Sequence, residues 1–453
     1  MLIREKVSPV FRAFSSRNYR LFFAGQGISL IGTWMSQTAV IWLVYSLTNS
    51  ALLLGVVGFA QQIPNFLLSP FAGVLIDRLN RHRILIVTQI LSMIQSLALA
   101  ALAFSGTIHI WHIIVLSVFQ GCVNAIDMPT RQTFVVELVE QRENLGNAIA
   151  LNSSMFSGAR LVGPAIAGLV IAAVGTSMCF LIDGISYIAV IAGLLAMRIR
   201  PRKIAAIEPS NTVLRRLKEG FVYAFGFPPI RSILLLLGLV SLVGMPYTVL
   251  APIFATNILH GGPQTLGFLM ASSGCGALVS AIYLSSRSTI VGLGRIIAIA
   301  PTVFGTALIV FALSKVLWLS LMAMFVLGGS LILQSTSSNT ILQTIVDEDK
   351  RGRVLSLFTI AFISMATFGN LFAGSLASRI GAPNTLVIGG VICIAASIYF
   401  SRQLPALRQS ILPIYDRMGL LTEHHPSHRR FLWQVLQCCS HPIASLLRLG
   451  LVS

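Results

Sequence analysis

Charged side chains are scarce in this chain of 453 residues, and acidic ones are the scarcest. Charged residues make up 10% of the sequence, and only 14 residues are acidic; soluble domains carry about 25% charged residues. Hydrophobic residues make up 55% and recur in runs of about 20 residues, the length that crosses a bilayer as a helix. Hydrocarbon offers no partner to a free backbone N–H or C=O, so these runs are expected to be helical. The composition excludes a soluble domain and predicts an all-α polytopic membrane protein.

The sequence also lacks the signatures of several kinds of chemistry. The six cysteines are scattered, and no metal-ligand or disulfide spacing occurs, although residues 424–441 contain four histidines and two cysteines. The apolar runs contain no glutamate, histidines lie only at or near their ends, and there is no HExxH motif and no Walker loop. We therefore expect no metal, no cofactor, no enzymatic activity and no ATP-driven transport within this chain.

Basic residues are the charges that the chain does have, and they give it a net charge of +18. Such a charge can indicate nucleic-acid binding, but here 29 of the 32 lysines and arginines fall in alternate connections and the two terminal segments. This asymmetry is the positive-inside rule, which predicts that both termini are cytoplasmic. The expected partners of these residues are anionic lipid head groups rather than nucleic acid.

The apolar runs form two sets of six. We predict a cytoplasmic N-terminus at 1–20, a six-helix bundle at 21–197, a basic cytoplasmic linker at 198–231, a second six-helix bundle at 232–401 and a cytoplasmic tail at 402–453. Residues 153–164 align with residues 363–374 at an offset of 210, which indicates duplication and places Arg160 opposite Asn370. Two repeated halves predict a substrate path between them, near the middle of the membrane.

One charged connection has a recognisable pattern. GVLIDRLNRHR, residues 73–83, joins the second and third apolar runs, and its marked residues are Gly73, Asp77, Arg78, Arg81 and Arg83. It resembles the loop signature of the major facilitator superfamily, with Asn80 where that family usually has glycine and His82 at a basic position. The resemblance implies a cytoplasmic gate. An aspartate there can accept hydrogen bonds from the N-terminus of a neighbouring helix, and arginines can pair with acids or lipid phosphates.

A second pattern lies in the fifth apolar run. GARLVGPAIAG, residues 158–168, resembles the Gly-Pro signature of the superfamily's antiporters at Gly158, Gly163, Pro164 and Gly168, with Ala167 in place of one glycine. Small residues at this spacing allow two helices to pack closely, and a proline removes one backbone hydrogen bond. The resemblance implies export in exchange for protons, whereas ordinary packing of small residues is the alternative.

Two longer runs, FRAFSSRNYRLFFAGQGISLIGTWM at 11–35 and the stretch from DMPTRQTF to GLVIA at 127–172, narrow the resemblance. Over residues 10–400 the chain looks like the transmembrane secretion effector branch, which is similar to the enterobactin exporter and, more distantly, to macrolide efflux pumps. This implies a secondary exporter in a bacterial inner membrane, working by alternating access and proton antiport, with a siderophore or similar metabolite as its small-molecule substrate. A multidrug or macrolide pump, a lysophospholipid carrier and a non-transporting sensor are the alternatives. Ser117 stands where many proton-coupled members have arginine, which is a departure from the usual coupling residue.

Three charged residues fall inside the predicted spans, where charge is costly unless it is paired or faces a cavity. Arg160 is the candidate for the positive group of the translocation path. Asp127 either takes part in proton coupling or pairs with Arg131 one turn later, and Asp183 either carries a proton or reaches interfacial water. Gln26 and Gln37 lie on one face of the first span and could line the path or form hydrogen bonds between helices.

The gate interpretation predicts the behaviour of one conservative variant. Asp77→Asn keeps the size of the side chain but removes the charge that favours a helix N-terminus. We expect normal insertion into the membrane and loss of most export, measured as release of substrate into the medium. Normal export by a correctly inserted Asp77→Asn protein would remove the gate interpretation.

Overall fold

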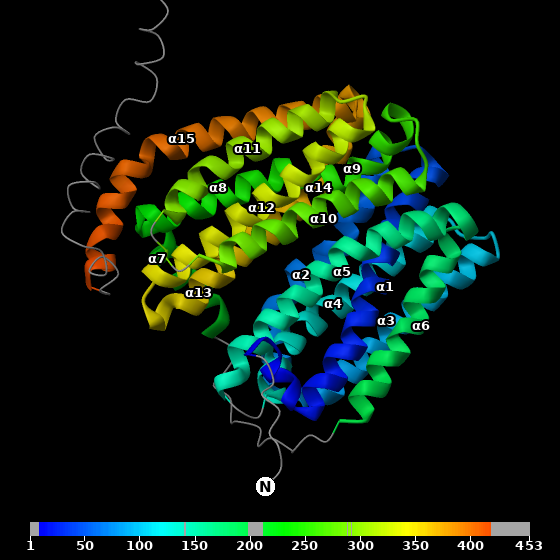
Figure 1. The fold of residues 1–453 in the computed structure, drawn as a ribbon, viewed down its shortest axis with the longest axis horizontal. Coiled ribbons are helices and arrows are strands. Elements are labelled where there is room, and N and C mark those ends of the chain that lie inside the picture. Colours follow the sequence, from blue (N-terminus) through cyan, green and yellow to red (C-terminus); the bar gives the residue numbers. More distant parts are fainter. Residues whose placement is uncertain (1–8, 140–141, 198–211, 288, 291, 418–453) are drawn as a thin grey trace, which may run out of the picture. The chain divides into compact units, whose positions relative to one another are not determined.

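A computed structural model describes residues 9–139, 142–197, 212–287, 289–290 and 292–417. Within these ranges it describes the backbone alone at residues 9–11, 69–75, 77, 78, 142, 212–218 and 417. The chain forms two compact units, Met1–Arg402 and Gln403–Ser453. Twelve helical spans among the described residues are long and apolar enough to cross a membrane. The predicted all-α polytopic fold is confirmed (Figure 1).

The first half consists of six spans that alternate in direction. They are α1 (Arg17–Thr48), α2 (Ala51–Arg78), α3 (Arg81–Phe104), α4 (Ile110–Leu138), α5 (Leu145–Val174) and α6 (Thr176–Leu195). The short 3-10 segments η1 (Pro9–Ser15) and η2 (Arg142–Asn144) precede α1 and α5. We call the end where α1 begins the N-terminal face, and the end with the α1–α2, α3–α4 and α5–α6 turns the opposite face.

The second half follows the helix α7 (Thr212–Gly226) and contains the other six spans. Two of these spans are interrupted by a π-helical turn. The seventh combines α8 (Pro228–Gly244), α9 (Tyr247–Ile253) and η3 (Phe254–Ile258), and the eleventh combines α13 (Glu348–Thr359), η4 (Ile360–Ser364) and α14 (Met365–Ile380). The other four are α10 (Pro263–Ser285), α11 (Leu293–Leu313), α12 (Leu317–Ile345) and α15 (Ala382–Arg417).

Several helix ends differ from the predicted boundaries. Helix α1 begins at Arg17 rather than at 21, because the Ser16 hydroxyl accepts the backbone N–H of Tyr19 as an N-cap. Helix α8 begins at Pro228, inside the predicted linker, since proline is favoured in the first turn of a helix. Helix α15 continues to Arg417, beyond the predicted end of the bundle at 401, with Pro405 and Pro413 inside it.

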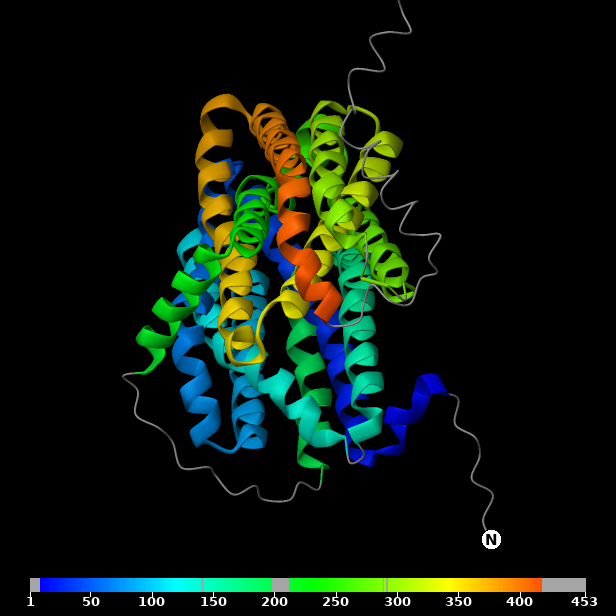
Figure 2. The same cartoon turned by 90° about the vertical axis from the view of Figure 1, so that its left-hand side faces the viewer.

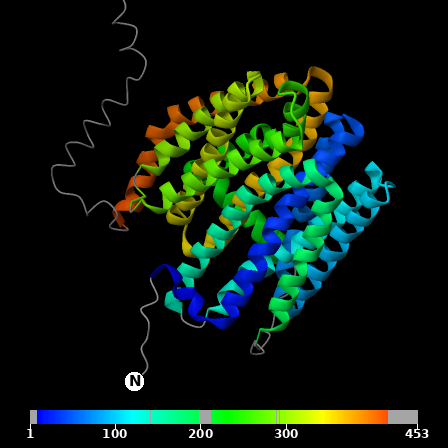
Figure 3. The ribbon, with the colours of Figure 1, turned by 45° about the vertical axis from the view of Figure 1, so that its right-hand side comes forward.

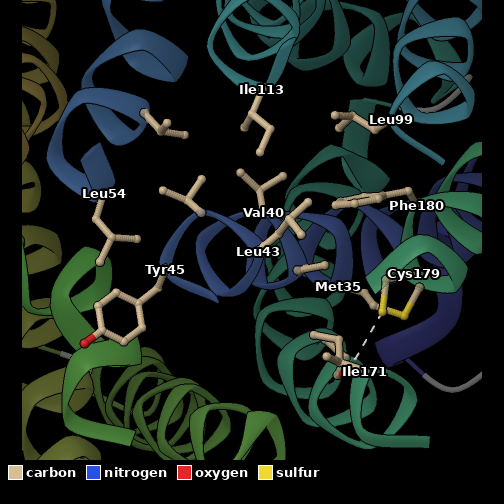
Figure 4. Close-up of a cluster of buried hydrophobic side chains, with 14 of the residues drawn as sticks. Met35, Val40, Leu43, Tyr45, Leu54, Leu99, Ile113, Ile171, Cys179 and Phe180 are labelled. Atoms are coloured by element: carbon tan, nitrogen blue, oxygen red, sulfur yellow. Dashed lines mark hydrogen bonds between the residues drawn. The ribbon is translucent and has the colours of Figure 1, made fainter. Parts of the chain in front are cut away.

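The core of the first half brings together all six of its helices (Figure 4). Met35 and Val40 of α1 are buried with Leu54 of α2, Leu99 of α3 and Phe180 of α6. Val249 of α9 belongs to the same cluster, so the first half packs against the second half at the opposite face. Apolar burial therefore joins the two halves near the α1–α2 turn, at the opposite face.

The two halves also meet along two pairs of helices, α5 with α10 and α2 with α14 (Figures 1 and 3). Glycines make both contacts close. A Cβ at Gly267 would lie 2.7 Å from the Pro164 carbonyl oxygen and 2.9 Å from the Gly168 Cα. A Cβ at Gly55 would lie 2.4 Å from the Asn370 carbonyl oxygen and 2.9 Å from the Gly374 Cα. In both pairs, backbone touches backbone in the part of the helices nearer the opposite face.

These matching contacts correct the predicted register of the repeat. Gly374 takes the place of Gly168, and Asn370 takes the place of Pro164, so the offset is 206 rather than 210. The helices α5 and α14 also end at equivalent glycines with positive φ, Gly175 and Gly381. The predicted alignment was wrong by four residues because a slip of about one turn keeps small and apolar residues on the same helix face.

The glycine contacts predict a difference between two residues of one motif. A Cβ at Gly168 would lie 2.7 Å from the backbone oxygen of Pro263, whereas Gly158 has no atom within 4 Å of the equivalent position. Gly168→Ala should therefore destabilise the protein by about 1–3 kcal/mol through overpacking, measured as a lower melting temperature in detergent. Gly158→Ala is the matched control and should melt at the wild-type temperature or slightly above it. Equal melting of the two variants would contradict this view of the contact.

Candidate translocation site

Arg160 lies near the middle of α5, where that helix contacts the second half. The backbone carbonyl of Arg160 and the Cα of Leu161 approach the position of a Cβ at Gly274 of α10 to 3.0 Å and 2.9 Å. The Arg160 guanidinium carbon lies 5.7 Å from the centre of the Trp34 ring, and the Trp34 and Phe156 rings meet edge to face at 5.6 Å. Arg160 and Trp34 are both half-buried. We call Arg160, Trp34 and Phe156 the arginine–aromatic cluster.

Gly163 makes this cluster possible by bringing α1 against α5. A Cβ at Gly163 would lie 2.5 Å from the Cβ of Trp34 and 2.9 Å from the Ile31 carbonyl oxygen. The antiporter-like motif therefore has two sides. Gly163 packs on α1, Pro164 and Gly168 pack on α10, and Gly158 has open space around it. Helix α5 continues without a break through Pro164.

Asp127 is the buried centre of a polar network between α3 and α4. Its side chain forms an ion pair with Arg131, one turn further along α4. The Thr88 hydroxyl and the Gln89 amide each donate to Asp127 Oδ1 at 2.8 Å. The residue is only 2% exposed. The structure thus contains the local ion pair that was one of the two alternatives, and α4 continues from there to Leu138 rather than ending one turn later.

Asp183 is the second buried acid, and it lies between α6, α3 and α1. The Ser96 hydroxyl donates to Asp183 Oδ2 at 2.6 Å, and the residue is 2% exposed. Gly32 of α1 leaves room for it, because a Cβ there would lie 2.9 Å from Asp183 Oδ1. Asp183 forms no ion pair with any side chain that the structure describes. The carboxylate is enclosed by three helices, so the interfacial-water alternative does not fit this position.

The polar face predicted for α1 packs mostly against α6. Thr33, which lies on the same face as Gln26 and Gln37, has its hydroxyl 3.3 Å from that of Tyr187. Gln26 is only 3% exposed, and Gln37 is half-buried. Gln26 is enclosed in this conformation, and whether Gln26 and Gln37 line the path or form hydrogen bonds between helices stays a prediction.

The charged connection between α2 and α3 is tied to the rest of the first half. The Asn80 side chain caps α3 by accepting the backbone N–H groups of His82 and Arg83, which gives a local reason for asparagine at the position where glycine is usual. Arg81 forms an ion pair with Glu137 of α4 at 2.6 Å. His82 Nε2 lies 2.8 Å from the carbonyl oxygen of Leu194 in α6.

The other members of the gate pattern are placed only in part. Gly73, Asp77 and Arg78 belong to α2 by their backbone, and their side chains lie outside the described part of the chain. Arg83 is exposed at the N-terminal face. The contact between Asp77 and a helix N-terminus therefore stays a prediction.

One contact at the N-terminal face had no clear signal in the sequence. Part of the linker forms the helix α7, which lies beside α13 (Figure 2). Arg353 forms an ion pair with Glu219 at 2.9 Å, and the Tyr223 hydroxyl donates to Asp347 at 3.2 Å. Burial, and then the nearby Asp347 charge, raise the pKa of Tyr223. A short amphipathic pattern predicts the helix, but it does not identify α13 as the surface that it contacts.

A metal site is not found among the described residues, since no three potential ligands gather there. The cysteines placed by the structure, Cys122, Cys179, Cys275 and Cys393, are all free thiols. The histidines and cysteines at 424–441 lie outside the described ranges.

Comparison with known proteins agrees with this geometry. A family model described as transmembrane secretion effector matches residues 8–418. The chain is 26% identical to the staphyloferrin A transporter of Staphylococcus aureus, over 84% of this chain and 95% of that protein. It is 25% identical to macrolide efflux protein A of Streptococcus pyogenes, over 83% and 95%. The crystal structure of an inward-facing, occupied bacterial homologue of the lysosomal transporter Spinster matches with a TM-score of 0.66 at 14% identity, over 90% of this chain and 99% of that one.

The network around Asp127 predicts energetic coupling between two residues. Arg131→Gln leaves a buried carboxylate without its cation, whereas Asp127→Asn removes the charge and keeps an oxygen that can accept from Thr88 and Gln89. The double variant should be more stable than the sum of the two losses implies, with a coupling free energy of about 0.5–3 kcal/mol. Thermal melting of the four proteins measures this coupling.

The more exposed Arg81–Glu137 pair is the matched control, and its coupling should be about 1 kcal/mol or less. Additive losses for Asp127 and Arg131 would show that the ion pair contributes nothing to stability.

Proposed function

Because the chain belongs to the transmembrane secretion effector family of the major facilitator superfamily, we propose that this multi-pass membrane protein exports a small molecule by alternating access. The supporting observation is the position of the arginine–aromatic cluster. Arg160 is a half-buried charge in the middle of a span, at the contact between two repeated halves. Charges at such depth occur where a substrate or ion passes, and repeated halves place that path between them.

The direction of transport rests on the orientation of the chain. The distribution of basic residues supports a cytoplasmic N-terminal face, with both termini on that side. The close glycine contacts lie toward the opposite face, so this conformation is closed on the outer side and receives its substrate from the cytoplasm.

Protons are the proposed driving ion. Asp127 and Asp183 are the carboxylates that lie away from the span ends, and the antiporter-like motif supports exchange. Ser117 replaces the usual arginine of α4 and is buried, so coupling has to run through other groups. Asp183 is the better candidate because it lacks a permanent cation partner among the described residues, whereas Asp127 is paired with Arg131.

The substrate proposed first is a siderophore or a similar secondary metabolite. The similarity to the staphyloferrin A transporter supports this choice, and the match covers 95% of the length of that protein. Macrolide efflux protein A matches over a similar span, so efflux of drugs is the second candidate. No catalytic constellation is needed for either function, and we infer a transporter rather than an enzyme.

A deletion strain tests the export proposal. Under iron limitation, cells lacking the protein should retain a metabolite that wild-type cells release, as seen by mass spectrometry of medium and cell extract. Wild-type protein should restore release, Arg160→Ala should not, and Arg160→Lys should restore part of it, because the charge survives without the planar fork. Raised macrolide sensitivity with an unchanged siderophore level would favour the second candidate. Normal release with Arg160→Ala would remove Arg160 from the path.

A further inference from the structure

Arg160 carries a positive charge that no part of the described protein neutralises. It forms no ion pair with any described side chain, and its counterpart in the second half, 206 positions later, is Ala366. A cation held at this depth is unfavourable unless it pairs with an anion or faces a cavity that an anion can enter. Trp34 contributes a cation–π contact at 5.7 Å, which offsets only part of that cost.

The sequence excludes a carboxylate from the opposite half. Residues 220–346 and 350–415 contain no aspartate or glutamate, so the second half has acids only at the ends of its spans and brings none to α5 from their interior. Away from the span ends, the first half has only Asp127 and Asp183. Asp127 is paired with Arg131, and Asp183 lies on the α6 side of α1. Trp34 and the arginine–aromatic cluster lie on the α5 side of α1.

The geometry of the cluster specifies what could bind there. A guanidinium group donates hydrogen bonds in parallel pairs, which match the two oxygens of a carboxylate or the oxygens of a phosphate. The Trp34 ring lies against the guanidinium, and Phe156 extends the aromatic surface edge to face. An oxyanion on Arg160 would therefore have an apolar, ring-lined surface beside it.

We propose that Arg160 binds the anionic group of the transported molecule, and that this molecule is a water-soluble organic anion with an apolar or ring-bearing part. The inference rests on the export function proposed above and names the substrate class of the same site. The arginine–aromatic cluster would present a like charge to a cationic drug, and it contains no carboxylate. The substrate itself supplies the missing counter-charge.

Two dyes with the same ring system and opposite charge test the proposal. The full-length protein in nanodiscs of neutral lipid is titrated with carboxyfluorescein, an anion, and with tetramethylrhodamine ethyl ester, a cation, and binding is followed by fluorescence anisotropy. Wild-type protein should prefer the anion by roughly tenfold or more. Arg160→Gln should lose that preference, and Arg160→Lys should keep part of it. Lys315→Gln removes the same charge at an exposed site between α11 and α12 and should behave as wild type.

The outcomes separate this inference from the export proposal. Equal binding of the two dyes, preference for the cation, or a preference that survives in a folded Arg160→Gln protein overturns the anion site. Displacement of carboxyfluorescein by citrate supports a water-soluble anion, whereas displacement by lysophosphatidic acid alone overturns that part in favour of a lipid. If the protein binds the anion but cells lacking it retain no metabolite, the export proposal is wrong and the anion site stands. If the protein exports a neutral or cationic metabolite, the export proposal stands and the anion site is wrong.

Discussion

Close approach of backbones between the two halves is the constraint on which the rest of this structure depends. Lipid is as apolar as leucine, so helices in a membrane gain little from burying apolar side chains and associate through tight packing instead. Gly168 and Gly267 allow this between α5 and α10, and Gly55 and Gly374 allow it between α2 and α14. The same packing puts the carbonyl of Arg160 beside Gly274. A larger side chain at these positions would separate the halves and take the arginine–aromatic cluster away from α10.

The repeated scaffold carries an unequal set of polar groups. In the first half, Asp127 and Asp183 are enclosed by hydrogen bonds between helices. In the second half the spans contain no acid between 220 and 346. There α12 buries Gln334, Ser337 and Ser338, whose side-chain polar atoms have no hydrogen-bond partner within the described residues. Buried polar groups are costly when unpaired. Water or a rearranged neighbour would satisfy these three side chains, so α12 carries unused hydrogen-bonding groups.

The N-terminal face is held by contacts of another kind. Ser16 donates to the carbonyl oxygen of Leu138, His82 reaches that of Leu194, and Arg81 pairs with Glu137. In the second half, α7 is fixed to α13 by Arg353 and Glu219. These are hydrogen bonds and ion pairs within each half, whereas glycine packing and the apolar cluster around Val249 join the halves nearer the opposite face. At the N-terminal face, polar contacts therefore hold the helices of each half together. The glycine contacts between the two halves lie nearer the opposite face.

The number of spans, the all-α class and the two sets of six followed from the sequence, because hydrocarbon leaves the backbone no alternative to a helix and the apolar runs have the length of a bilayer. Arg160, Asp127 and Asp183 could be singled out for the same reason, since charge is rare at that depth. The register of the repeat could not be predicted, because a shift of four residues leaves the face of a helix almost unchanged. For the three charges, the sequence offered one local partner, Arg131 for Asp127, and that only as one of two alternatives. Whether a buried charge is paired, enclosed or open depends on which helices lie beside it. Tertiary packing alone decided that Asp127 meets Thr88, that Asp183 meets Ser96, and that Arg160 lies against Trp34 without an acid.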